Sequence, residues 1–132
     1  MTSYHFSVTV SGEFGDVVER TKAALAQEGF GILTEIDVAA TMKAKLDVDR
    51  DPYLILGACN PPMAHQAIEA DPAIGVLLPC NVVVRQHGEG RVLVDFMDPE
   101  AVLQLVDKPG ITKVAGEVRT RLEMARDTLA RS

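Results

Sequence analysis

The chain has 132 residues, a length that fits one domain and allows a hydrophobic core without disulfides or metals. Its formal net charge of −6 and its few aromatic residues argue against a nucleic-acid or membrane partner, because neither attracts an acidic surface with few stacking platforms. The N-terminus lacks the basic and apolar segments of a signal peptide, and no apolar run approaches the ~20 residues of a spanning helix. We therefore expect a cytoplasmic protein, in which cysteines are more often free thiols than disulfides.

The first half of the chain alternates between strand and helix patterns. Residues 4–10 have an apolar side chain at every second position, which is typical of a half-buried strand. Apolar residues then recur at helical spacing from Phe14, and Gly29 suits the end of this helix. Residues 30–38 alternate again and predict a second strand, which a short helix over residues 39–46 follows.

The central part of the chain carries the most distinctive pattern. Residues 53–59 form a continuous apolar run, which predicts a strand covered on both faces. Asn60 is a good helix cap, and the helix that it begins ends before Pro72. Residues 75–85 predict a long strand, and Pro79 within it predicts a bulge or an edge, because proline cannot donate to a strand ladder.

The last third of the chain predicts a hairpin and two helices. The glycine-rich residues 86–90 indicate a turn, and residues 91–96 form the returning strand. A short helix begins at Pro99, and residues 111–130 have apolar residues at steps of three or four, typical of an amphipathic helix. We therefore predict a single α+β domain over the whole chain, with a mostly antiparallel sheet and helices packed on one face.

Both cysteines lie at predicted strand ends, and an asparagine follows each of them. We treat Cys59, Asn60, Cys80 and Asn81 as candidate ligand-binding residues. Cys59 also precedes a helix N-terminus, whose positive dipole end lowers a thiol pKa and favours the reactive thiolate. Two alternatives stay open: the cysteines are small buried hydrophobic residues, or they form a disulfide.

Glu35 and Asp37 form a second candidate pair. Strand alternation places both carboxylates on one face, roughly 7 Å apart along the strand. A helix over that face would shift at least one pKa and make the pair a functional candidate. We expect instead that water covers the face, because carboxylates are rarely buried without a partner.

The sequence carries no diagnostic cofactor or metal motif. The glycine patterns of dinucleotide-binding folds, P-loops and serine hydrolases are absent. Cys59, Cys80 and His65 have ligand types that suit a metal, but their spacing is not diagnostic. We therefore predict no cofactor and no metal, and the sequence does not decide whether a reaction is catalysed.

Four segments resemble the successive motifs of the domain-of-unknown-function 302 family: residues 29–33, 35–38, 56–61 and 77–82. The resemblance extends from the first strand to about Pro99. It implies a small α+β protein with a strand and helix arrangement like that of the TATA-binding protein, a tendency to form dimers, and a loose link to sulfur oxidation. The motif positions that it implies in this chain are Glu35, Asp37, Cys59, Asn60, Pro61, Pro79, Cys80 and Asn81.

Two functional hypotheses follow from these residues. In the first, the protein binds a small molecule or handles a reactive sulfur species through Cys59 and Cys80. In the second, it is a non-enzymatic homodimeric binding or structural module with inert buried cysteines. The dimer or its ligand would then use the uncovered sheet face, on which we expect His5, Ser7, Thr9, Glu35 and Asp37.

Overall fold

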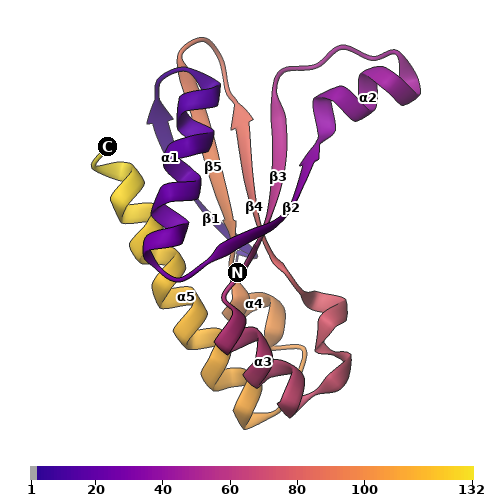
Figure 1. Ribbon diagram of the computed structural model, residues 1–132, viewed down its shortest axis with the longest axis vertical. Coiled ribbons are helices and arrows are strands. Elements are labelled where there is room, and N and C mark those ends of the chain that lie inside the picture. The colour runs from indigo at the N-terminus through magenta and orange to yellow at the C-terminus, as the bar shows by residue number, and fades with distance from the viewer. Residues whose placement is uncertain (1–2) are drawn as a thin grey trace.

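The computed structural model describes residues 3–132 and contains a five-stranded antiparallel sheet with the strand order β1-β5-β4-β3-β2 (Figure 1). Every neighbouring pair of strands is antiparallel, which confirms the predicted α+β class. The strands are β1 (His5–Ser11), β2 (Gly31–Asp37), β3 (Tyr53–Cys59), β4 (Cys80–Gln86) and β5 (Arg91–Met97).

Helices α1 and α5 cover one face of the sheet and contact each other (Figure 1). Helices α3 and α4 pack against α5 beyond one end of the sheet, whereas α2 stands apart from the other helices. The helices are α1 (Phe14–Gln27), α2 (Val38–Leu46), α3 (Pro61–Ala70), α4 (Pro99–Leu103) and α5 (Pro109–Ala130), and a 3₁₀ helix η1 (Pro72–Leu77) follows α3.

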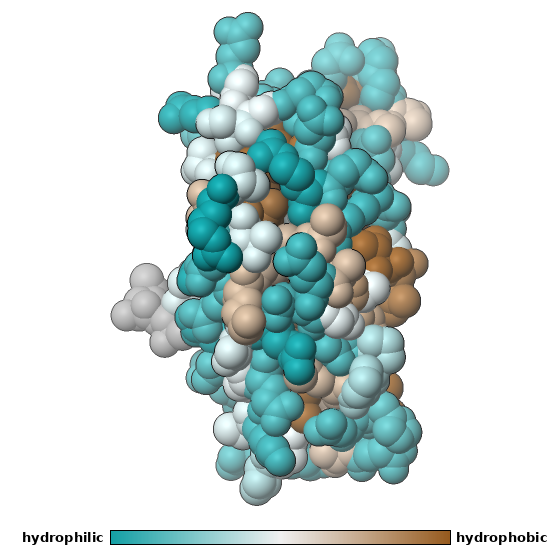
Figure 2. Space-filling model, turned by 60° about the vertical axis from the view of Figure 1, so that its left-hand side comes forward, coloured by the Kyte–Doolittle hydropathy of each residue, from teal (hydrophilic) through white to brown (hydrophobic). Residues whose placement is uncertain are grey.

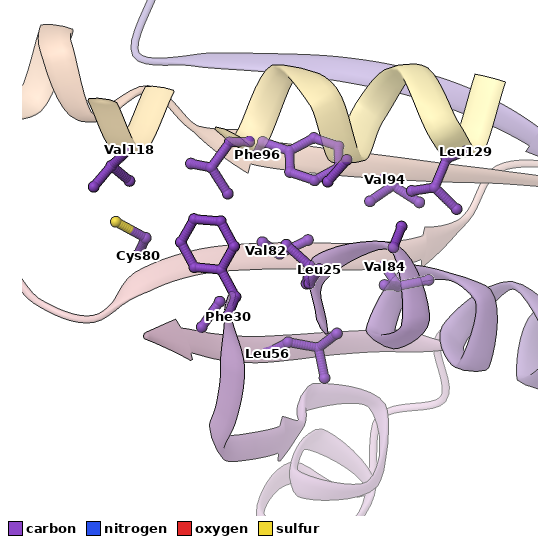
Figure 3. Close-up of a cluster of buried hydrophobic side chains, with 14 of the residues drawn as sticks. Leu25, Phe30, Leu56, Cys80, Val82, Val84, Val94, Phe96, Val118 and Leu129 are labelled. Carbon is purple, nitrogen blue, oxygen red and sulfur yellow. The ribbon is translucent and has the colours of Figure 1, made fainter. Parts of the chain in front are cut away.

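The core lies between the central strands and the two covering helices, as Figure 3 shows. Alternate residues of β4 and β5 point toward the helices, and Val84 and Phe96 among them are fully buried. Leu25 from α1 and Leu129 from α5 meet them from the helical layer. The side chains at every second strand position and the apolar stripe of α5 are therefore buried against each other.

The expected strand over residues 75–85 is wrong in its first half. The side chain of Asp71 accepts a hydrogen bond from the Ala73 amide, and Pro72 occupies the first turn, so η1 forms there. Pro79, which follows a cis peptide bond, precedes the first residue of β4. The proline therefore lies outside the ladder, and the strand needs no bulge to accommodate it.

A bulge in β2 determines which way its carboxylates point. The register shifts between Ile32 and Thr34, and Glu35 then lies opposite Leu56, which is fully buried on the helix side. Asp37, two residues later, points the same way. The expectation that these carboxylates share the uncovered face with the polar residues of β1 was therefore wrong, because the bulge inserts one residue into the alternation.

The outer surface of the helical layer is mostly hydrophilic. Figure 2 shows the side on which α1 and α5 lie, where hydrophobic atoms form only limited patches between polar side chains. Between residues 3 and 132, none of the helices has both the length and the hydropathy of a membrane-spanning segment.

Candidate functional site

An apolar cavity of about 280 Å³ lies beyond one end of the sheet, where α3, α4 and α5 meet the ends of β3 and β4. Leu33 and Ile68 form part of its wall, and both residues are exposed, so the cavity opens to the surface there. Most of the remaining wall is buried hydrocarbon, including Ala58, Met63, Ala67, Leu103, Val114 and Val118. We call this feature the apolar cavity.

Asn60 fixes the helix that forms one side of the apolar cavity. Its side-chain oxygen accepts a hydrogen bond from the Met63 amide at 3.4 Å and caps α3. Its side-chain nitrogen donates to the Glu28 carbonyl at 3.4 Å, at the end of α1. With α3 held in this way, Met63 and Ala67 on its buried stripe line the cavity. The side-chain nitrogen and the side-chain oxygen of Asn60 therefore both form hydrogen bonds within the protein.

Cys80 is a buried thiol in the cavity wall. Figure 3 shows its sulfur pointing from β4 toward Val118 of α5, beside the ring of Phe30. Across the ladder it lies opposite Ala58. Burial raises the pKa of Cys80 to about 12, with a smaller contribution from repulsion by Cys59. The Cys80 thiol is therefore neutral at physiological pH.

Cys59 lines the same cavity from the end of β3 and is partly exposed. Burial raises its pKa as well, so the expectation that the start of α3 would lower this pKa was wrong. Burial causes this shift, because the loss of hydration disfavours the charged thiolate. Both cysteines are free thiols, so the structure contains no bridge between them.

The other predicted site residues lie elsewhere. Asn81 points to the opposite face of the sheet, in a hollow away from the apolar cavity. Glu35 forms an ion pair with Lys22 of α1 at 3.1 Å, and Asp37 caps α2 by accepting from the Ala40 amide at 2.9 Å. The structure therefore brings the two cysteines and Asn60 together at one cavity but not these three residues.

The cavity wall contains residues that sequence analysis did not select. Val114 and Val118 belong to the apolar stripe of α5, and Leu103 belongs to α4. The stripes were visible in the sequence, but they carried no sign that the helices leave a space between them. His65 lies on the exposed side of α3, and the described part of the chain holds no cluster of three or more His, Cys, Asp or Glu side chains that could bind a metal.

Comparison with known proteins agrees with this architecture. The model of the family described as "Domain of unknown function DUF302" matches residues 6–129. The crystal structure of an uncharacterized conserved DUF302 protein from Bacillus stearothermophilus superimposes with a TM-score of 0.88 and 29% sequence identity, over 97% of this chain and 99% of that one. The search of curated proteins found no match.

Proposed function

Since the chain belongs to the DUF302 family, whose description specifies no activity, we propose a function from the cavity itself: the protein binds a small apolar molecule there. The observation that carries the proposal is the wall, which offers hydrocarbon from three helices and almost no polar group. Ligand pockets are typically apolar clefts of roughly 300–1,000 Å³, and the apolar cavity, at about 280 Å³, lies just below that range. The ligand is accordingly small.

In this proposal the thiols of Cys59 and Cys80 are part of the wall. A neutral thiol is a polarisable and weakly polar group, compatible with an apolar ligand. Handling of a reactive sulfur species would instead need a thiolate, and the raised pKa of both cysteines opposes its formation at neutral pH. Of the two, the partly exposed Cys59 is the better candidate for such chemistry.

Titration with indole, a small neutral aromatic compound, tests the proposal by NMR amide shifts. We expect saturable shifts for amides of α3 and of the β3 end in the wild type. The variant Ala64→Leu extends a cavity-lining side chain and should weaken binding at least about tenfold, because it fills part of the space. Gln66→Leu on the exposed side of α3 is the matched control and should bind as the wild type does.

Alkylation by iodoacetamide under native conditions separates the apolar-ligand proposal from thiol chemistry. We expect slow modification of Cys59, almost none of Cys80, and slower modification of Cys59 when indole is bound. Rapid modification of Cys59 at neutral pH, together with absence of indole binding, would favour the reactive-sulfur function instead.

A second proposed property is homodimer formation through β2 and α2. No residue of α2 is buried, and β2 is an edge strand with an unpaired outer side. Large hydrophobic side chains of this region are exposed, with Leu46 at 65% and Ile36 at 50%. A second copy of the chain at this position would cover the unpaired edge of β2 and bury the exposed hydrophobic side chains, which supports a symmetric contact here.

Light scattering after size exclusion, at several micromolar concentrations, tests the dimer. Leu46→Glu should shift the wild-type dimer toward the monomer, because the charge would be buried in the contact. Leu105→Glu is the matched control, since Leu105 is 79% exposed between α4 and α5 and lies outside the proposed contact. A wild-type protein that is monomeric at every concentration would rule out the dimer.

A further inference from the structure

A second hollow, of about 450 Å³, lies on the sheet face that α1 and α5 leave uncovered. Side chains from β1, β3, β4 and β5 line it, and unlike the apolar cavity it combines charged, polar and apolar groups. Its lining includes His5, Tyr53, Asn81, Arg85 and Asp95. We call it the open-face hollow.

Asp95 is the centre of a hydrogen-bond chain in this hollow. One carboxylate oxygen accepts from the Ser7 hydroxyl at 2.5 Å, and the other accepts from Nε of Arg85 at 2.7 Å. Because Ser7 donates its only hydrogen to Asp95, its oxygen accepts from Nδ1 of His5 at 3.2 Å. This series of hydrogen bonds fixes the position of Arg85 through its Nε atom alone.

Arg85 consequently presents the rest of its guanidinium group to the hollow. Among residues 3–132, neither terminal nitrogen of Arg85 has a hydrogen-bond or ion-pair partner. Its side chain remains 35% exposed. A guanidinium group held at Nε with both terminal nitrogens available is arranged to bind two oxygens of an anion at once.

The remaining lining indicates what kind of anion fits. Val83, two residues from Arg85 on β4, and Met97, at the end of β5, provide apolar surface in the hollow, and the ring of Tyr53 adds an aromatic wall. Asp95 neutralises much of the charge of Arg85, so the hollow suits a single negative charge better than a multiply charged phosphate. Tyr53 and Asn81 supply uncharged hydrogen-bonding groups at the edge.

We propose that the open-face hollow binds an organic carboxylate. The carboxylate accepts hydrogen bonds from the two terminal nitrogens of Arg85, and the hydrocarbon part of the ligand lies against Val83 and Met97. The site is separate from the apolar cavity, since it lies on the uncovered face of the sheet rather than beyond its end and shares none of the lining residues of that cavity.

Benzoate is the probe, and NMR amide shifts report both the affinity and the location. Saturable shifts should centre on β4 and β5 around Asn81, Arg85 and Asp95. Arg85→Gln should weaken binding at least about tenfold, the loss expected when a charge-assisted pair is removed. Arg91→Gln is the matched control, because Arg91 lies exposed on the same face of β5 at the far end of the strand.

A second variant guards against a loss that reflects misfolding. Asp95→Asn keeps the shape of the side chain and removes the charge that competes for Arg85, so benzoate should bind more tightly. Benzyl alcohol, the uncharged counterpart, should bind at least about tenfold more weakly than benzoate. Equal binding of the two compounds, unchanged benzoate binding in Arg85→Gln, or weaker binding in a folded Asp95→Asn would each overturn the proposal.

Discussion

At the scale of single residues, burial changes the pKa of Cys80 and thereby makes the stability of the protein depend on pH. Its thiol is buried in the apolar cavity, and its pKa rises from the ordinary 9.0 to about 12. Above pH 9 the unfolded chain releases a proton that the folded chain retains. The contribution of Cys80 to stability is therefore complete below pH 9 and is lost as the pH rises toward 12.

Urea unfolding at pH 8 and pH 10 tests this effect in the wild type and in Cys80→Ala. The stability advantage of the wild type over the variant should shrink by about 1 kcal/mol between the two pH values, because one pKa unit corresponds to ~1.4 kcal/mol. Cys59→Ala is the comparison, and its partly exposed thiol should show a smaller change in the same direction. A constant advantage at both pH values would mean that Cys80 is not buried as described.

Gly57 is a second residue whose environment is narrow. A Cβ atom there would overlap the hydroxyl oxygen of Thr34 and lie 3.0 Å from a ring carbon of Pro79. Gly57→Ala should therefore lower the free energy of unfolding by about 1–3 kcal/mol, the usual cost of overpacking. Gly31→Ala in the neighbouring strand meets nothing within 4 Å and should cost less.

Thermal unfolding measures both glycine variants. Adding Thr34→Ala to Gly57→Ala removes the nearest of the two contacts and should restore part of the stability, while the contact with Pro79 remains. If Gly57→Ala is as stable as the wild type, Thr34 and Pro79 pack less tightly against Gly57 than the structure indicates.

At the scale of elements, Asp98 links α4 to α5 through hydrogen bonds and an ion pair. Its side chain is 7% exposed, accepts from the amides of Glu100 and Ala101, and forms an ion pair with Arg119 at 2.7 Å. Because α4 and α5 both line the apolar cavity, this one carboxylate contributes to its shape. It acts as a helix cap and as an interhelical contact at once.

Asp98→Ala should destabilise the protein by about 2–4 kcal/mol, since it removes the cap and leaves Arg119 without its closest partner. Glu100→Ala is the control, because Glu100 is more exposed and lies 3.9 Å from Arg119. Urea denaturation midpoints of the two variants measure the difference. Equal midpoints would show that the Asp98 contacts contribute little.

At the scale of the whole molecule, the sequence predicts the element order and the antiparallel sheet because both depend on local patterns. Asn60 at the end of an apolar strand indicates a cap, and the structure shows that cap. The face of Asn81 also follows from local geometry, since the neighbour of an inward-pointing Cys80 points outward. That alternation was available in the sequence, and it separates Asn81 from the cavity.

Other features depend on contacts between distant segments. The bulge between Ile32 and Thr34 turns Glu35 toward α1, and none of residues 32–34 is a glycine or a proline that would indicate it. The apolar cavity needs Val118 of α5 beside Cys80 of β4, residues that no local pattern connects. The sign of the Cys59 pKa shift followed from that burial, so the helix position alone gave the wrong direction.

If the proposed function is right, the apolar cavity admits a small apolar molecule. The most direct measurement is the anomalous diffraction of a crystal pressurised with xenon, which enters apolar cavities. We predict a xenon peak between α3 and α5, in contact with Met63 and Cys80, and loss of that peak in Ala64→Leu. Strong xenon peaks elsewhere, with none in this cavity of the wild type, would contradict it.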